Sequence, residues 1–111
     1  MHTVLQSEEF KVWFTDLKPK AKEDIYAAVR VLQEIGPSLG RPRVDTLKGS
    51  KLKNLKELRV QSGGDPYRIF FAFDRNRVIL LLAGGNKRGQ KRFYETMVPD
   101  AVRIFKTLAG E

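Results

Sequence analysis

The fold is decided by residues 55–85, LKELRVQSGGDPYRIFFAFDRNRVILLLAGG. Within Leu55–Gln61, Leu58 and Val60 share one face and Glu57, Arg59 and Gln61 share the other. Alternate residues again separate onto two sides from Tyr67 to Asp74. Alternation with a period of two is typical of β-strands. The residues that separate the strands, Ser62–Pro66 and Asp74–Arg77, contain the glycine, proline, aspartate and asparagine that favour tight turns.

The third strand of this region is Val78–Ala83, a continuous apolar run that is typical of a central strand buried on both faces. Gly84-Gly85 is expected to end it. Three sequential strands with short connections predict an antiparallel meander. Met1–Gln6 predicts a fourth short strand that adds to this sheet, and Val44–Leu47 is a candidate for a further one.

Helical periodicity flanks the strands on both sides. Ser7 can cap a first helix, Gly36-Pro37 ends a second, and Pro99 is expected to kink or divide the last. Their apolar stripes contain Phe10, Trp13, Phe14 and Leu17, then Ile25, Ala28, Val29 and Leu32, then Tyr94, Met97, Val98, Ala101, Phe105 and Leu108. The sequence predicts one α+β domain over residues 1–111. It would be a small, mostly antiparallel four-stranded sheet with an N-terminal helical hairpin and a C-terminal helix.

Positive charge is concentrated in the second half of the chain. Residues 1–36 carry five Lys/Arg and six Asp/Glu, whereas Arg41–Arg92 contains fourteen Lys/Arg and four Asp/Glu, a net charge of +10. This asymmetry favours a polyanionic partner, most commonly nucleic acid, over a merely solvated basic face. An anionic membrane surface is disfavoured, because the basic residues interrupt strands and do not line one amphipathic helix.

The composition excludes several classes of protein. The chain has no cysteine, so it has neither a disulfide framework nor thiolate metal ligands, which fits a reducing compartment. Its single histidine, His2, excludes two-histidine ribonuclease chemistry and multi-histidine metal sites within one chain. No apolar run approaches the roughly 20 residues of a membrane span, and the N-terminus does not read as a signal peptide. We expect a cytoplasmic protein without a metal or cofactor.

Two arginines lie inside the predicted strands. Arg68 interrupts an aromatic strand and Arg59 occupies a similar position on the preceding one, so both could project from one face. Guanidinium groups suit phosphate oxygens, which predicts an anion site. The alternative is that the arginines form ion pairs with Glu57 or Asp74. Glu57 is the one acidic residue inside the basic strand region, and we expect it to pair with Arg59 or a lysine.

A basic segment follows the glycine pair and contains Lys87, Arg88, Lys91 and Arg92. It resembles a phosphate-binding loop only loosely, because the Walker A spacing is absent. Tyr94 lies just beyond this segment, in helical register with the apolar stripe. It could therefore be a core residue, or a side chain that stacks on a base or carries a proton.

These segments resemble the RelE/ParE superfamily of bacterial toxins, in particular its phage-derived, HigB-like branch. The resemblance rests on LKGSKLKNLKELRV (Leu47–Val60), PYRIFFAFD (Pro66–Asp74) and VILLLAGGNKRGQKRFYE (Val78–Glu95). It implies a single RelE-like domain that is the toxin of a type II toxin–antitoxin pair. RelE-like and HigB-like toxins cut messenger RNA in the ribosomal A site, by attack of a ribose 2′-hydroxyl on the adjacent phosphate.

The resemblance also implies roles for single residues. Arg68 would contact the scissile phosphate, and Lys87 or Arg88 would neutralise charge or assist the leaving group. Tyr94 would stack on the nucleotide or help to activate it, and Arg59 would position RNA and assist proton abstraction. The implied RNA-binding residues are Lys48, Lys51, Lys53, Lys56, Lys91 and Arg92, of which Lys56 matches loosely.

The sequence also departs from the family pattern, since HigB-like toxins often place a histidine in the site and here the only one is His2. One alternative is a ParE-like toxin that inhibits DNA gyrase without hydrolysis, and another is an inactive RNA-binding module. The implied partners are messenger RNA on the ribosome and a cognate antitoxin, often a helix-turn-helix protein. The antitoxin would either cover the basic face with acidic residues or displace the C-terminal helix.

Overall fold

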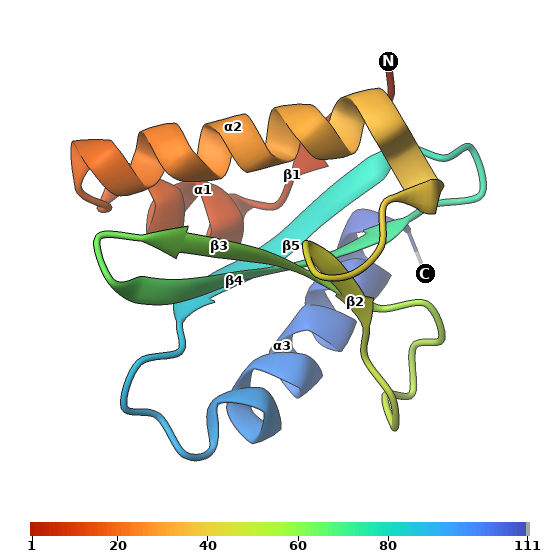
Figure 1. Cartoon of the computed structure of the whole chain (residues 1–111). Helices are drawn as coiled ribbons and strands as arrows, with labels where there is room; N and C mark the ends of the chain where they lie inside the picture. The colour runs from red at the N-terminus through yellow and green to blue at the C-terminus, as the bar shows by residue number, and fades with distance from the viewer. Residues whose placement is uncertain (111) are drawn as a thin grey trace.

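The computed structural model describes residues 1–110 and consists of one sheet between two helical layers (Figure 1). Helices α1 and α2 cover one face of the sheet, and α3 crosses the other. In chain order the elements are β1 (Val4–Gln6), α1 (Glu8–Thr15), α2 (Pro19–Ile35), a 3₁₀ turn (Gly36–Ser38), β2 (Val44–Thr46), β3 (Lys56–Ser62), β4 (Asp65–Phe73), β5 (Ile79–Asn86) and α3 (Phe93–Leu108).

The sheet has the strand order β1-β5-β4-β3-β2, with β1 parallel to β5 and the other neighbours antiparallel. This confirms the α+β class, the meander, the helical hairpin and the C-terminal helix. The expected number of four strands is wrong by one. The candidate strand near Val44 forms, because Val44–Thr46 pairs with the first residues of β3, with Val44 opposite Leu58.

The β3–β4 connection is a two-residue hairpin at Gly63 and Gly64. Both residues have positive φ angles, 56° and 83°. Glycine tolerates this region, and such turns match the natural twist of paired strands. The predicted turn is confirmed, and it fixes the register that places Arg59 directly opposite Arg68.

The glycine pair does not end the central strand as expected. β5 continues through Gly84 and Gly85 to Asn86, which pairs with Tyr67. A Cβ atom added at Gly84 would lie 2.2 Å from the Trp13 ring of α1, and one at Gly85 would lie 2.8 Å from the Phe93 ring of α3. The two glycines therefore leave room for helices on opposite faces of the sheet.

The Ser7 side chain joins the first helical layer to the sheet. Ser7 caps α1 as predicted, because its hydroxyl accepts a hydrogen bond from the Phe10 N–H at 2.9 Å. The same hydroxyl donates to the Leu82 carbonyl at 2.6 Å, which ties α1 to β5.

Pro99 does not divide the last helix, since α3 runs without a break from Phe93 to Leu108. Ala101 and Phe105, both buried against the sheet, hold its second half in line.

The two faces of the sheet contain separate apolar cores. Toward α1 and α2, the core includes Leu58, Ile69 and Phe71, packed with Ile25 and Leu32. Toward α3, it is built from Phe70, Ala72, Leu80, Leu82, Phe93, Ala101, Ile104 and Phe105, among others. Within residues 1–110, none of the helices has the length and apolar character needed to cross a membrane.

Candidate active site

A cluster of charged and polar side chains interrupts the apolar face toward α3. We call it the polar cluster, and it consists of Glu57, Arg59, Arg68, Lys87 and Tyr94. The first two come from β3, Arg68 comes from β4, Lys87 follows β5 and Tyr94 lies in the first turn of α3. Because Arg59 and Arg68 are cross-strand partners, they project from the same face, as the sequence predicts.

Glu57 is the centre of the polar cluster, with only 3% of its side chain exposed. One carboxylate oxygen, Oε1, accepts a hydrogen bond from the Tyr94 hydroxyl at 2.6 Å and lies 3.6 Å from Arg68 Nε. The other, Oε2, accepts from Arg59 Nε at 3.1 Å. Both arginines thus form ion pairs with Glu57, the alternative that the sequence offers beside an anion site, and the anion site stays a prediction. Asp74 instead accepts backbone N–H groups in the β4–β5 turn.

The two arginines differ in their access to solvent. The Arg59 side chain is 31% exposed, and its Nη2 also donates to Asp45 Oδ2 at 3.2 Å. The Arg68 side chain is 14% exposed, and its Nη1 donates to the Tyr67 carbonyl at 3.0 Å, while its buried Nε has no hydrogen-bond partner among residues 1–110. Arg59 is therefore the guanidinium that a phosphate group can reach more easily.

The Tyr94 ring packs in the core, as one of the two alternatives from the sequence predicts, and its hydroxyl reaches the polar cluster. Its ring packs edge-on against Phe70 and Phe93, with centroid distances of 6.1 and 5.3 Å. Burial raises the pKa of the Tyr94 hydroxyl above its ordinary value, and the hydrogen bond to Glu57 raises that pKa further, partly offset by Arg68. The phenol therefore keeps its proton at neutral pH and donates a hydrogen bond to the Glu57 carboxylate.

The neighbouring residues Lys87 and Arg88 point to different places. Lys87 Nζ lies over the Tyr94 ring, 5.0 Å from its centroid, which is a cation–π contact. Arg88 turns to the β3–β4 hairpin instead, where it donates to Asp65 Oδ1 and to the Gly64 carbonyl. The Arg88 guanidinium lowers the pKa of Asp65. Of the two candidates, only Lys87 joins the polar cluster.

Residues 12–106 match the family described as phage-derived protein Gp49-like (DUF891). The chain belongs to this family. The Gp49-like chain is 43% identical over 100 residues to "Putative toxin HigB2" of Mycobacterium tuberculosis, an alignment that covers 88% of this chain and 50% of HigB2. It therefore spans half the length of that relative. It is also 43% identical over 90 residues to "Putative toxin HigB3" of the same organism, which covers 80% and 77% of the two chains.

The fold is similar to that of the Escherichia coli toxin RelE, in the free state of a variant with two arginine-to-alanine substitutions. The TM-score is 0.60, and the match covers 92% of this chain and 95% of that one at 13% sequence identity. At this identity the likeness concerns the fold. The family match and the two HigB relatives confirm the HigB-like resemblance that the sequence indicates, and the fold is RelE-like, as expected.

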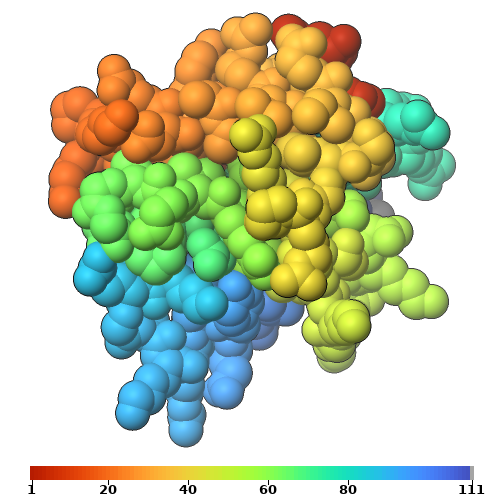
Figure 2. All heavy atoms as spheres, viewed as in Figure 1, coloured from red at the N-terminus to blue at the C-terminus, as the bar shows by residue number. Residues whose placement is uncertain are grey.

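The remaining basic residues of the Gp49-like chain do not all gather at the polar cluster. Lys56 lies opposite Phe71 and shares the face toward α2, where its Nζ donates to Thr46 Oγ1 at 2.9 Å. Lys91 and Arg92 are exposed just before α3. The other predicted RNA-binding residues, Lys48, Lys51 and Lys53, are exposed on the β2–β3 loop, which projects separately from the blue segment after β5 (Figure 2).

Sequence reasoning missed two acidic members of this region. Glu57 was expected only as a pairing partner, although strand alternation with Arg59 already places both side chains on one face. Asp45 had no comparable signal, because its contact with Arg59 depends on the β2–β3 register. His2 lies elsewhere, with its Nδ1 3.2 Å from the Arg77 carbonyl oxygen. Within residues 1–110, no three His, Asp or Glu side chains gather closely enough to hold a metal ion.

Proposed function

We propose that this Gp49-like chain is the toxin of a type II toxin–antitoxin pair and cleaves messenger RNA on the ribosome. The observation that carries the proposal is the buried Glu57 carboxylate, 2.6 Å from the Tyr94 hydroxyl and flanked by Arg59 and Arg68. One small region thus holds a proton acceptor and several cations. The similarity to proteins named as HigB toxins and the net charge of +10 over Arg41–Arg92 support the same function.

In the proposed reaction, a ribose 2′-oxygen attacks the adjacent phosphorus. The bond between the 2′-oxygen and phosphorus forms while the bond between phosphorus and the 5′-oxygen of the next nucleotide breaks. The products are a 2′,3′-cyclic phosphate and a 5′-hydroxyl end. The reaction needs an acceptor for the 2′ proton, positive charge beside the pentavalent phosphorus, and a donor for the departing 5′-oxygen.

The 2′ proton is transferred through Tyr94 to Glu57. Because only 3% of the Glu57 side chain is exposed, RNA cannot reach the carboxylate directly. The Tyr94 side chain is half-buried, and its hydroxyl already donates to Glu57. As the Tyr94 proton moves onto the carboxylate, the phenol oxygen accepts the proton of the 2′-hydroxyl. This relay explains why a tyrosine whose pKa is raised can still serve as the group that touches RNA.

The cations of the polar cluster stabilise the negative charge that develops on the phosphate. Arg59 offers the more exposed guanidinium and binds the phosphate oxygens, while Arg68 lies behind it and balances the charge of Glu57. Lys87, over the Tyr94 ring, donates the proton to the 5′-oxygen. Lysine, arginine and tyrosine therefore perform the work that histidines perform in two-histidine ribonucleases.

Other basic residues act outside the reacting centre. Lys91 and Arg92, exposed in the segment before α3, bind the RNA backbone. Arg88 holds this segment against the hairpin and does not contact the leaving group. Lys48, Lys51 and Lys53 lie between β2 and β3, and we place them outside the reacting centre because this loop projects separately from the segment after β5 (Figure 2). A cognate antitoxin would silence the free toxin.

The test is to induce the protein in bacteria and map the ends of messenger RNA. We expect growth arrest and cuts within translated transcripts for the wild type, and neither for Tyr94→Phe or Arg68→Ala at equal levels of folded protein. Growth arrest with intact transcripts and a loss of DNA supercoiling would instead identify a ParE-like gyrase inhibitor. Unchanged toxicity in both variants would contradict the assignment of the polar cluster.

A further inference from the structure

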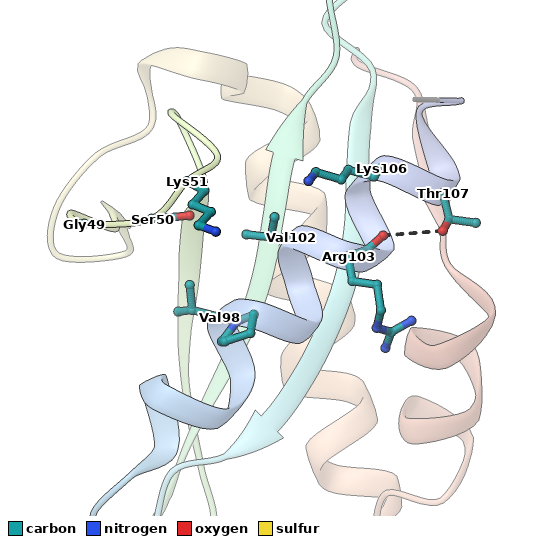
Figure 3. A pocket seen from close by; sticks show the side chains of 9 residues that line it. Gly49, Ser50, Lys51, Val98, Val102, Arg103, Lys106 and Thr107 are labelled. Carbon is teal, nitrogen blue, oxygen red and sulfur yellow. Dashed lines mark hydrogen bonds between the residues drawn. The ribbon is translucent and has the colours of Figure 1, made fainter.

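A groove of about 600 Å³ runs along the outer side of α3, between this helix and the β2–β3 loop (Figure 3). Gly49, Ser50 and Lys51 form one wall, and side chains from the second half of α3 form the other. None of the residues of the polar cluster lines it. The groove is therefore a second surface feature, which the proposed reaction does not use.

The floor of the groove is apolar and lacks aromatic rings. It is formed by Val98, Pro99 and Val102, of which both valines are half-buried and Pro99 is exposed. The valines also pack against the core under α3, so the floor is rigidly supported. An exposed apolar surface of this kind in a concave site is typical of places that receive apolar side chains from a partner.

The charged side chains at the rim are all positive. Lys51 from the loop and Lys106 from α3 both line the groove, and Figure 3 shows them pointing toward it from opposite sides. Among residues 1–110, no carboxylate lies within 4.0 Å of either ammonium group. Arg103 points away and lies 3.7 Å from Glu9 of α1. Two lysines without partners thus stand on either side of an apolar floor.

We infer that this groove binds an acidic amphipathic helix of a protein partner. Such a helix would place apolar side chains, spaced three or four residues apart, on the two valines and Pro99, with carboxylates on its flanks beside Lys51 and Lys106. Helix-in-groove recognition takes this form, and the opposite charges would fix the orientation of the helix. The inference does not depend on RNA cleavage.

The composition of the groove favours a protein helix over RNA. Single-stranded RNA is usually held by aromatic side chains on which its bases stack. No aromatic residue lines the groove. Its floor offers only aliphatic side chains, which match leucine or isoleucine better than a sugar–phosphate chain. We therefore expect RNA to bind this groove more weakly than an acidic helix.

The experiment uses the full chain labelled at its valine methyl groups and a synthetic helical peptide of about 14 residues, or four helical turns. The peptide carries leucines on one face and glutamates on both flanks. We expect saturable NMR shifts of the Val98 and Val102 methyl groups. A peptide with lysine in place of each glutamate should shift them at least about tenfold more weakly. Equal binding of both peptides, or no shift with either, would overturn the inference.

A charge-reversal variant and a matched control complete the test. Lys51→Glu combined with Lys106→Glu should weaken binding of the acidic peptide by about tenfold or more. The control, Lys18→Glu combined with Arg30→Glu, changes the net charge equally on exposed positions of the other helical layer and should bind like the wild type. Equal weakening by both variants would show that only the net charge of the protein matters, and would overturn the inference. Oligouridylate shifting the same methyl groups as strongly would reassign the groove to RNA.

Discussion

The two faces of the sheet are built from alternate residues of the same strands, yet they bury different chemistry. Leu58 and Glu57 are neighbours on β3 and both are buried, at 1% and 2% exposure. Leu58 faces an apolar core beneath α1 and α2, whereas Glu57 faces two arginines and a tyrosine beneath α3. Two helices cover the first face, and the single helix α3 leaves room for the polar cluster on the second.

This difference separates stability from function. Burying a charged carboxylate is costly, and well-packed apolar residues of similar volume often stabilise a protein as well or better. The face beneath α1 and α2 shows that this sheet can bury a core built mainly of apolar side chains. The burial of Glu57 among three polar partners therefore indicates a catalytic role. We expect substitutions at the polar cluster to lower the cleavage rate, and substitutions in the core beneath α1 and α2 to lower the free energy of unfolding.

The largest effect is expected for Glu57→Gln, which keeps the shape but removes the proton acceptor. Loss of a general base typically costs 10²–10⁴-fold, so we expect cleavage to slow by about 10³-fold, or about 4 kcal/mol. Single-turnover cleavage of translated messenger RNA measures it. The matched control is Asp45→Asn, which removes the other carboxylate beside Arg59 but does not touch Tyr94. Equal losses in both variants would contradict the role of Glu57.

The neighbouring substitution Leu58→Ala should produce the reverse pattern. Truncating a fully buried leucine leaves a cavity, so we expect the free energy of unfolding to fall by about 3 kcal/mol. The cleavage rate per folded molecule should remain unchanged, because Leu58 faces away from the polar cluster. Urea unfolding and cleavage at matched folded concentration check both parts. A rate loss comparable to that of Glu57→Gln would mean that the two faces are not separable.

Tyr94→Phe keeps the packed ring and removes only the hydroxyl. We expect cleavage to fall by about 10²-fold and the free energy of unfolding to fall by about 1 kcal/mol, since one hydrogen bond to a carboxylate is lost. Retention of more than half the wild-type rate would exclude the relay.

The same variant should alter stability at high pH. The pKa of Tyr94 is raised in the folded state, so the unfolded chain releases this proton first as pH rises past about 10. The stability from Tyr94 is therefore fully present below that pH and is lost as pH rises through the raised pKa. Tyr94→Phe should flatten this part of the alkaline unfolding curve, and an unchanged curve would contradict the pKa assignment.

The smallest effect is expected at the boundary of the polar cluster, where Arg88 holds the segment between β5 and α3 against the β3–β4 hairpin. Arg88→Gln or Asp65→Asn should reduce cleavage by up to about fivefold, because exposed ion pairs contribute little to stability. The swap Arg88→Asp with Asp65→Arg should recover part of the rate. Arg103→Gln, which removes two exposed ion pairs, with Glu9 and Asp100, is the control and should cleave normally. A loss at Arg88 as large as the roughly 10²-fold loss expected for Tyr94→Phe would instead place Arg88 in the reacting centre.

Local patterns in the sequence predict the secondary-structure elements and the β-meander, but not the contacts between elements that are distant in the sequence. Alternation in the first two strands, the apolar run Val78–Ala83 and the Gly63-Gly64 turn predict the meander and place Arg59 and Arg68 on one face. The continuation of β5 through Gly84 and Gly85 could not be predicted, because it depends on rings of α1 and α3 that pack on those glycines. The separation of Lys87 from Arg88 likewise depends on Asp65, which is 23 residues away.

The central claim is that the polar cluster cleaves RNA through the 2′-hydroxyl, and the chemistry of the product ends tests it most directly. Purified protein should be added to a purified translation system, and the fragments analysed for their termini. We predict 2′,3′-cyclic phosphate and 5′-hydroxyl ends, and uncut messenger RNA when Glu57→Gln replaces the wild type over the same time. Intact messenger RNA with the folded wild type, or fragments that carry 5′-phosphate ends, would contradict the account.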